Sequence, residues 1–485
     1  MNQFISVTKQ FINGEWKEGS SKNKGTILNP FNNEVIKEVS LASKEDINNA
    51  YLIAEKAQKE WAKTSAEEKA QILLRASQYM EDHKDEIIDV LVKESGSTVG
   101  KAEFELYACI QTFKDAATYP YRMETIVAPS EQPGKVNRVF RKPIGVIASI
   151  SPFNFPLFLS IRTIVPAIAT GNAVVHKPDL QTAISGGGVI AKAFEEAGLP
   201  AGVFNLIVTD ISEIGDYFVE HPVPKFISFT GSTAVGRHIG AIAGQNLKRV
   251  ALELGGNSPY IVLEDADIDQ AVDSAIFGKF LHSGQICMMI NRIFVHRSKY
   301  DEFVQKFVER AKNLKYGNPE DPTVVIGPII NERQIEKILS FAKMAEEDGA
   351  TVALRGERVG NVVTPFVFTN VTNDSRIAQT EIFGPIATII PFDTEEEAIR
   401  LANETDYGLS AGVFTQDLER GLAVAQKIES GMAHVNDQPV NVEAQMPFGG
   451  EKGSGLGRFG GRWALEEFTT VQWVSVQEKP RKYPF

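Results

Sequence analysis

The cysteine at position 287 is the first residue whose chemistry needs an explanation. The run Phe280-Leu-His-Ser-Gly-Gln-Ile-Cys287 begins like a helix and breaks at Ser283-Gly284, so the thiol follows a turn and has apolar neighbours. A thiolate there could act as a nucleophile, whereas a buried free cysteine is usually inert. Cys109 is the only other cysteine and no CxxC occurs, so we expect neither a disulfide framework nor a metal site.

A glutamate forms a coherent pair with this thiol, and an asparagine is a separate candidate. Glu253 lies in the apolar run Leu252–Leu254 before Gly255-Gly256, where desolvation would raise its pKa and make it a usable base. Asn154 lies on a loop bounded by Pro152 and Pro156, and a constrained amide could donate to an oxyanion. The alternatives are a solvated carboxylate at a strand end and an amide that bonds its own turn.

A glycine-containing turn indicates an anion site. The run Phe229-Thr-Gly-Ser-Thr-Ala-Val-Gly236 follows an apolar strand-like segment and precedes a helix-like one, so free amides at a helix start could meet a pyrophosphate. Its spacing is not the GxGxxG pattern, and a plain glycine turn is the alternative.

The elements that must position these residues alternate in type along the chain. Residues 44–99 are predicted to form helices packed by one face, and two series of alternating apolar strands and helices follow, which predicts two α/β domains. Residues 123–142, around Pro133-Gly134, favour a projecting hairpin, and 470–477 favour a terminal strand with open edges. The strand and helix segments that we expect in the first series are 146–150, 157–169, 173–176, 189–197, 204–208 and 226–229; those in the second include 260–263, 266–280, 293–295, 300–314 and 432–435.

Charge and composition exclude several classes of partner. The 485 residues carry a net charge of −12, which disfavours binding to nucleic acid or to anionic membranes. The N-terminal residues do not resemble a secretory leader, so we expect a cytoplasmic protein. Residues 143–161 carry no charge, but Pro152, Asn154 and Pro156 favour a buried strand and helix over a membrane span.

Seven ordered motifs reveal a family resemblance. The chain resembles NAD(P)-dependent aldehyde dehydrogenases over essentially its whole length, and its GQICM run resembles the branch that acts on aromatic aldehydes such as benzaldehyde and vanillin. The motifs are PFNFP, GNAVVHKP, FTGSTAVG, LELGGNSP, GQIC, EIFGP and PFGGEKGSG.

The resemblance implies a role for each motif. Cys287 would be the nucleophile and Glu253 the general base, and Asn154 would stabilise the oxyanion together with the backbone amide of Cys287. Arg458 and its glycine-rich surroundings would form an anchor loop below the site. The residues implied to bind the cofactor are Lys177 and Glu381 at the two riboses, Gly231, Ser232 and Gly236 at the pyrophosphate, and Phe383 near the nicotinamide.

The resemblance also implies an architecture. We expect an α/β protein of the aldehyde dehydrogenase type, with an atypical Rossmann domain, an α/β catalytic domain and a β-arm through which homodimers or homotetramers form. The ranges that we expect are 1–120 and 144–255 for the cofactor domain, 256–455 for the catalytic domain, and 121–143 with 456–485 for the arm and terminal strand.

The details of cofactor and substrate are less constrained. Many NAD-preferring relatives carry a glutamate where this chain has Leu180, beside Asp179, so we expect NAD or NADP to serve. Met288 and Met289 replace smaller residues, and four phenylalanines could line an aryl slot or belong to the core. They are Phe153, Phe155, Phe158 and Phe280.

Other functions are compatible with parts of the sequence. An aliphatic or semialdehyde dehydrogenase would use the same mechanism. A CoA-acylating relative would typically lack Glu253, and a non-catalytic member would not need thiol, base and amide together. A cysteine protease is disfavoured because no histidine motif accompanies Cys287.

Overall fold

The computed structural model describes residues 2–485, and its first large unit is an eight-stranded sheet with helices on both faces. Five adjacent strands are parallel, in the order β9-β8-β7-β10-β11, which is the order 3-2-1-4-5 along the chain. The sheet consists of β1 (Gln10–Ile12), β2 (Glu15–Lys17), β7 (Val146–Ile150), β8 (Ala173–Lys177), β9 (Phe204–Leu206), β10 (Phe226–Thr230), β11 (Arg249–Glu253) and β23 (Gly455–Leu456).

The strand order of this sheet reverses between β7 and β10. In doubly wound sheets the crevice beyond the carboxyl ends of two such strands is where ligands bind. The strands β7 and β10 end at Ile150 and Thr230, so Asn154 and Gly231 follow them directly into this crevice. The sheet therefore brings two of the predicted site segments together.

Helices cover both faces because successive strand residues point to opposite sides. Val146 and Ala148 of β7 pack in one core with α2 and α10, while Ile147 packs in the other with α6 and α7. Every residue of α6 is buried, which confirms that the uncharged segment before it belongs to the core. The helices of this unit are α1 (Gln3–Val7), α2 (Lys44–Trp61), α3 (Ala66–Asp82), α4 (Lys84–Ser95), α5 (Val99–Ala116), α6 (Pro156–Ala169), α7 (Val189–Ala197), α8 (Ile211–Ile214), α9 (Tyr217–Glu220) and α10 (Thr233–Gln245).

A seven-stranded sheet forms the second unit. Six of its strands are parallel, in the order β17-β18-β13-β12-β20-β21, and β14 joins one edge antiparallel. Its strands are β12 (Ser258–Val262), β13 (Ile290–His296), β14 (Thr351–Leu354), β17 (Phe366–Thr369), β18 (Ile386–Phe392), β20 (Gly412–Phe414) and β21 (His434–Val435). Its helices are α11 (Ile268–Phe280), α12 (Tyr300–Lys312), α13 (Glu332–Glu347), α14 (Arg376–Gln379), α15 (Glu395–Asn403) and α16 (Leu418–Ala425).

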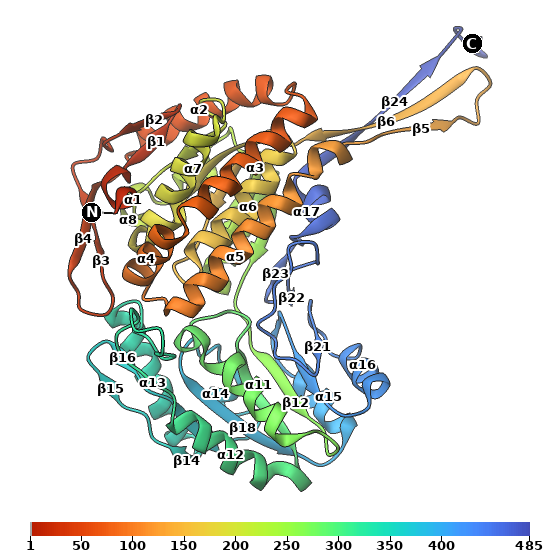
Figure 1. Cartoon of the computed structure of the whole chain (residues 1–485). Helices are drawn as coiled ribbons and strands as arrows, with labels where there is room; N and C mark the ends of the chain where they lie inside the picture. Colours follow the sequence, from red (N-terminus) through yellow and green to blue (C-terminus); the bar gives the residue numbers. More distant parts are fainter. Residues whose placement is uncertain (1) are drawn as a thin grey trace.

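A three-stranded antiparallel arm projects from the body beside α17 (Gly461–Glu467) (Figure 1). The predicted hairpin supplies β5 (Thr125–Pro129) and β6 (Lys135–Pro143), and the predicted terminal strand is β24 (Thr469–Gln477), which pairs with β6 along its whole length. Three small ribbons complete the strands: β3 (Lys24–Leu28) with β4 (Val35–Ser40), β15 (Arg358–Val359) with β16 (Val362–Val363), and β19 (Tyr407–Gly408) with β22 (Glu451–Lys452).

The α/β class and the arm thus agree with the sequence analysis, while the domain ranges remain a prediction. The chain returns to the first sheet late, because β23 pairs with β11 at Gly455 and Leu456. A side-chain carbon at Gly455 would lie 2.0 Å from the carbonyl oxygen of Leu252, so the glycine-rich segment lies directly against β11. Within residues 2–485, no helix is long and apolar enough to cross a membrane.

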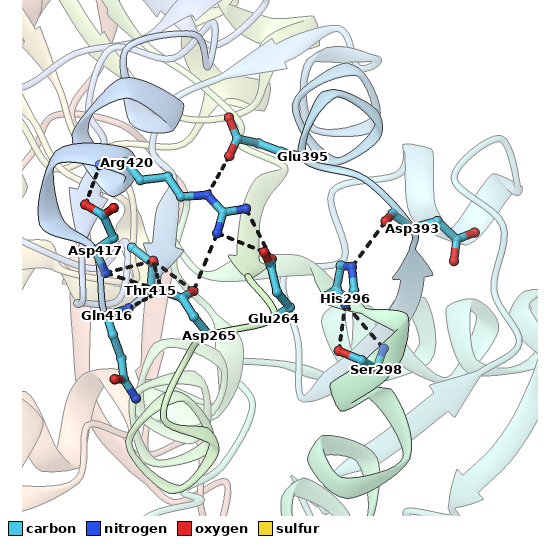
Figure 2. Close-up of polar contacts among 10 residues, drawn as sticks. All are labelled: Glu264, Asp265, His296, Ser298, Asp393, Glu395, Thr415, Gln416, Asp417 and Arg420. Carbon is cyan, nitrogen blue, oxygen red and sulfur yellow. Dashed lines mark hydrogen bonds and ion pairs between the residues drawn. The ribbon is translucent and has the colours of Figure 1, made fainter.

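The carboxyl edge of the second sheet carries a polar network, shown in Figure 2. The guanidinium of Arg420 donates to Glu395 over 2.7 Å and to Glu264 over 2.9 and 3.2 Å. Asp265 accepts hydrogen bonds from Thr415 and from the amides of Gln416 and Asp417. This network joins the carboxyl ends of β12 and β20 to α15 and α16. Cys287 lies before the amino end of β13, which is at the opposite edge of the same sheet.

Candidate active site

Cys287 lies in the wall between two cavities. The larger one is bordered by the ends of β7 and β10 and by Glu381 and Phe383. The smaller one is lined almost entirely by apolar side chains. Cys287, Asn154 and Leu159 border both cavities. A ligand in one cavity can therefore meet a ligand in the other cavity at the thiol.

The chain reaches Cys287 through a turn of unusual backbone conformation. His282, Ser283 and Gly284 are consecutive left-handed residues with φ of 52°, 55° and 75°. Two of them are not glycine, which costs conformational energy that the surrounding packing must offset. The hydroxyl of Ser283 donates to the carbonyl of Gly327 over 2.9 Å, and this bond holds the turn in place.

The Asn154 side chain is directed at the segment that carries the thiol. Its amide nitrogen donates one hydrogen bond, of 2.9 Å, to the backbone oxygen of Gln285, two residues before Cys287. An amide has two N–H donors, so the second is available to a ligand at the thiol. Asn154 is 3% exposed, which keeps competing water away from this donor.

Glu253 is the last residue of β11 and is 2% exposed. Burial raises the pKa of its carboxyl to about 7, and the charges of Arg162 and Arg458 oppose this rise. Its Oε1 atom has no hydrogen-bond partner among residues 2–485. The carboxyl therefore titrates near neutrality and has a free oxygen for water, as a general base requires.

The turn after Glu253 packs against the nucleophile segment. A side-chain carbon at Gly256 would lie 2.1 Å from the carbonyl oxygen of Cys287, so glycine is required there. Burial raises the pKa of the Cys287 thiol to about 12, partly opposed by the charge of Arg162. The thiol is therefore protonated at neutral pH and needs a base to become a nucleophile.

The larger cavity has donors suited to a dinucleotide. Ser232 precedes α10 without a side-chain cap, so the first amides of this 13-residue helix are open to an anion. A side-chain carbon at Gly231 would collide with Phe229, and one at Gly236 would collide with Leu254. Glycine at both positions therefore lets the backbone lie directly against these side chains. The amino end of α10 therefore has the donors and the open backbone that a phosphate would need.

Two partly buried charged residues could serve the same ligand: Glu381 lines the larger cavity and Lys177 ends β8, the strand beside β7. Burial lowers the pKa of the Lys177 ammonium at the end of β8, while the charges of Asp179 and Asp210 raise it. Burial raises the pKa of Glu381 to about 7, and Glu381 accepts a 2.9 Å hydrogen bond from the amide of Gly256. Both groups are desolvated and incompletely paired, as expected of groups that bind the hydroxyls of a ligand.

Comparison with known proteins agrees with this geometry. A sequence profile described as "Aldehyde dehydrogenase family" matches residues 16–474. The chain belongs to the aldehyde dehydrogenase family.

Named relatives cover the chain from end to end. It is 48% identical to the benzaldehyde dehydrogenase YfmT of Bacillus subtilis, covering 100% of both chains, and 49% identical to a vanillin dehydrogenase of Corynebacterium glutamicum, covering 98% of both. The crystal structure of an NAD-dependent benzaldehyde dehydrogenase from Corynebacterium glutamicum superposes with a TM-score of 0.91 at 46% identity, covering 99% of this chain and 98% of that one. The expected fold and branch resemblance are thereby confirmed.

Six of the nine predicted catalytic and cofactor-binding residues of this aldehyde dehydrogenase line the larger cavity, whereas Glu253, Lys177 and Gly236 line neither cavity. Phe383 has a left-handed φ of 52° and meets the ring of Phe153 edge-on, with 6.0 Å between centroids. Arg458 donates to the carbonyl oxygens of Gly450 and Gly457, and so fixes the glycine-rich segment beneath Glu253. The predicted residues on the larger cavity are Asn154, Gly231, Ser232, Cys287, Glu381 and Phe383.

The four phenylalanines, for which an aryl slot and the core were both open, take different places in the structure. Phe155 and Phe158 line the smaller cavity, and Phe153 lines the larger one. Phe280 is fully buried in the core of the second sheet, 5.9 Å from the ring of Phe307. It is the last residue of α11, whose apolar face packs on the sheet, so it does not contribute to an aryl slot.

Sequence reasoning missed Arg162. Its guanidinium lies 3.8 Å from the carboxylate of Glu253 and within 4.2 and 4.8 Å of the ring centroids of Phe448 and Phe459. Two of its nitrogens have no hydrogen-bond partner among residues 2–485. The sequence did contain a signal, because Arg162 is a single charge at the end of the uncharged apolar stretch 143–161. A charged side chain is rarely buried unless it has a partner or a role.

Proposed function

We propose that this aldehyde dehydrogenase oxidises aromatic aldehydes to carboxylic acids with NAD⁺, through a covalent thioester on Cys287. The observation that carries the proposal is the position of the thiol between the cavity at the amino end of α10 and an apolar chamber. The chamber is lined by aromatic and aliphatic side chains, which suit an aryl group. They are Phe104, Phe155, Phe158, Leu159, Ile286, Met288, Val440, Val442 and Phe448.

The residues support this reaction in two stages. In the first, the Cys287 thiol loses its proton to solvent, its sulfur adds to the aldehyde carbon, and the Asn154 amide stabilises the alkoxide. The bound nicotinamide supplies a hydride acceptor, and departure of the hydride leaves the thioester. In the second stage, Glu253 removes a proton from water, which attacks the thioester and releases the acid.

The cofactor proposal depends on the donors around the larger cavity. The amides at the start of α10, with Lys177 and Glu381, suit a pyrophosphate flanked by two riboses. NADP⁺ is a second candidate because Leu180 supplies no carboxylate to repel a 2′-phosphate, and Asp179 is engaged by the amide of Gln181 over 2.9 Å. An inactive NADP⁺ in steady-state assays would refute that part.

A substrate panel tests the aromatic preference. Benzaldehyde and vanillin should give kcat/KM values at least about tenfold above those of aliphatic aldehydes and semialdehydes of similar size. Equal values, or a preference for a semialdehyde, would overturn it. Acid formation without CoA distinguishes hydrolysis from acyl transfer, and Cys287→Ala is the inactive control.

We also propose a cytoplasmic homodimer or homotetramer assembled through the arm. The arm exposes apolar side chains that water does not favour, including Val127 at 65%, Val471 at 61% and Trp473 at 65%. Light scattering should show an oligomer that Val127→Glu dissociates, whereas Val359→Glu, at an exposed valine on β15, should leave it intact. The cytoplasm suits a free catalytic thiol because it is reducing.

A further inference from the structure

Helix α5 carries an ion pair that is completely removed from solvent. Lys101 and Glu105 are one helical turn apart, both side chains are 0% exposed, and the ammonium lies 2.5 Å from the carboxylate. Neither residue belongs to a motif that the reaction uses. Their remaining hydrogen bonds are directed largely at one segment, the PFNFP loop and the start of α6.

The lysine holds the backbone of the oxyanion donor. Its Nζ atom donates to the backbone oxygen of Asn154 over 2.8 Å and to the hydroxyl of Ser97 over 2.9 Å. The same ammonium lies 4.0 Å from the ring centroid of Phe155, which lines the apolar chamber. One cation thus contacts both the donor residue and a wall of the substrate chamber.

The glutamate holds the helix that follows this loop. Phe155, the residue before α6, offers no side-chain cap. Oε1 of Glu105 accepts hydrogen bonds from the amides of Leu157 and Phe158, over 2.9 and 3.1 Å. A carboxylate from α5 therefore replaces the missing cap, and its charge is favourable at a helix amino end.

Contact between the two helices alone does not require an ion pair. The other buried residues on this face of α5 include Ala102, Leu106, Cys109 and Phe113, which pack without polar groups. Buried ion pairs rarely stabilise a protein more than apolar residues of similar volume. What this pair provides is a fixed position at both ends of residues 154–158.

We propose that the Lys101–Glu105 pair is a positioning device that holds the Asn154 amide at the place where the alkoxide forms. The proposal rests on the proposed roles of Cys287 and Asn154. Lys101 fixes the Asn154 backbone from one side, and the hydrogen bond from the Asn154 side chain to the Gln285 oxygen fixes it from the other. The Asn154 residue is thereby held at both its backbone and its side chain, next to the segment that carries the thiol.

The test is a double-mutant cycle on the hydride-transfer step. In single-turnover experiments with benzaldehyde and NAD⁺, Lys101→Met should slow NADH formation by roughly tenfold to a hundredfold, because small displacements of catalytic groups have effects of this size. The KM for NAD⁺ should stay within about twofold, since the pair does not face the cofactor. In an Asn154→Ala background the same change should cost about twofold or less, because the group that it positions is gone.

Two controls separate positioning from folding. Glu94→Leu removes another fully buried carboxyl group that accepts backbone amides, those of Ile184 and Ser185, and leaves these amides unpaired, so it should lower the melting temperature without slowing hydride transfer. Ser97→Ala removes one partner of Lys101 and leaves the ion pair intact. This variant is a milder probe if Lys101→Met does not fold. It should slow NADH formation, and this slowing should likewise vanish in the Asn154→Ala background.

The outcomes distinguish failure of the oxyanion role of Asn154 from failure of the positioning role of the ion pair. If Asn154→Ala alone forms NADH at the parent rate, the proposed oxyanion role fails. If Asn154→Ala is slow and Lys101→Met slows it further by its full factor, the oxyanion role stands and the positioning role is overturned.

Discussion

The guanidinium of Arg162 lies 3.8 Å from the carboxylate of Glu253, and both side chains are at least 95% buried. This distance is too long for a strong hydrogen bond, so the arginine acts on the glutamate mainly through its charge. Burial alone would raise the pKa of Glu253 further than the value of about 7 that it has beside this cation. The pair therefore keeps a desolvated carboxyl ionisable at neutral pH.

Replacing Arg162 with methionine should move the pH profile of the enzyme. Without the cation the pKa of Glu253 rises, so a larger fraction is protonated and unable to activate water at neutral pH. The acid limb of kcat, near pH 7 in the parent, should shift upward by about one unit. A kcat profile measured under deacylation-limited conditions checks this, and an unchanged limb would exclude the charge effect.

Glu253→Gln separates the two stages of the proposed reaction. Acylation and hydride transfer should still give a first equivalent of NADH per active site, after which the thioester accumulates because no base activates water. Stopped-flow absorbance of NADH should show a burst followed by a steady rate at least about a hundredfold below the parent. Intact-mass detection of the acylated enzyme is the second readout. Turnover at the parent rate would remove Glu253 from its assigned role.

The same substitution should change the pH dependence of stability. The pKa of Glu253 is about 7 in the folded protein against an ordinary value of 4.5, so the folded state retains a proton that the unfolded chain loses between these values. The contribution of this proton to stability is complete below about pH 4.5 and is lost as the pH rises through 7. Glu253→Gln avoids the cost of burying the charge, so it should be more stable than the parent near pH 8, by up to about 3 kcal/mol. Melting temperatures that differ equally at about pH 5 and pH 8 would contradict this linkage.

Much of the fold could be predicted because its signals are local. Alternation of apolar strands and helices is visible along the chain, and glycines at 255 and 256 mark the end of a strand. The meeting of Asn154 with Cys287 has no local signal, since it depends on the switch in strand order between β7 and β10. Only the family resemblance linked those two residues before the structure did.

Two features of the site region, a buried ion pair and left-handed turns, escaped prediction for physical reasons. Lys101 and Glu105 are spaced i, i+4, as are Glu302 and Lys306 on the exposed face of α12, so spacing alone cannot separate a buried pair from a solvated one. The left-handed residues His282 and Phe383 are not glycine, so composition gives no sign of the turns that they form. In both cases tertiary packing overrides what the local sequence favours.

Met288→Ala should widen the chamber and change its selectivity. Met288 lines the apolar cavity and is 5% exposed, so removing its side chain leaves space next to Cys287. The ratio of kcat/KM for vanillin to that for benzaldehyde should rise roughly fivefold, since pocket methylenes are worth about 1–3 kcal/mol each. Met289→Ala is the matched control, because Met289 is equally buried and does not line the chamber. Equal effects of the two substitutions would place the selectivity elsewhere.

Arg420→Met should destabilise the second sheet without affecting catalysis. Arg420 makes two hydrogen bonds to Glu264 and one to Glu395 (Figure 2). It thereby links α16 and α15 to the carboxyl end of β12. Its loss leaves two carboxylates without their cation, so unfolding should become easier by about 1–2 kcal/mol, seen as a lower melting temperature. Arg297→Met, at an exposed arginine that pairs with Asp393 on the same edge, should leave the melting temperature close to that of the parent, since solvent screens that pair. The kcat of both variants should match that of the parent, because this edge of the sheet is opposite the edge near Cys287. A lower kcat, measured where the enzyme is fully folded, would show that the two edges are coupled.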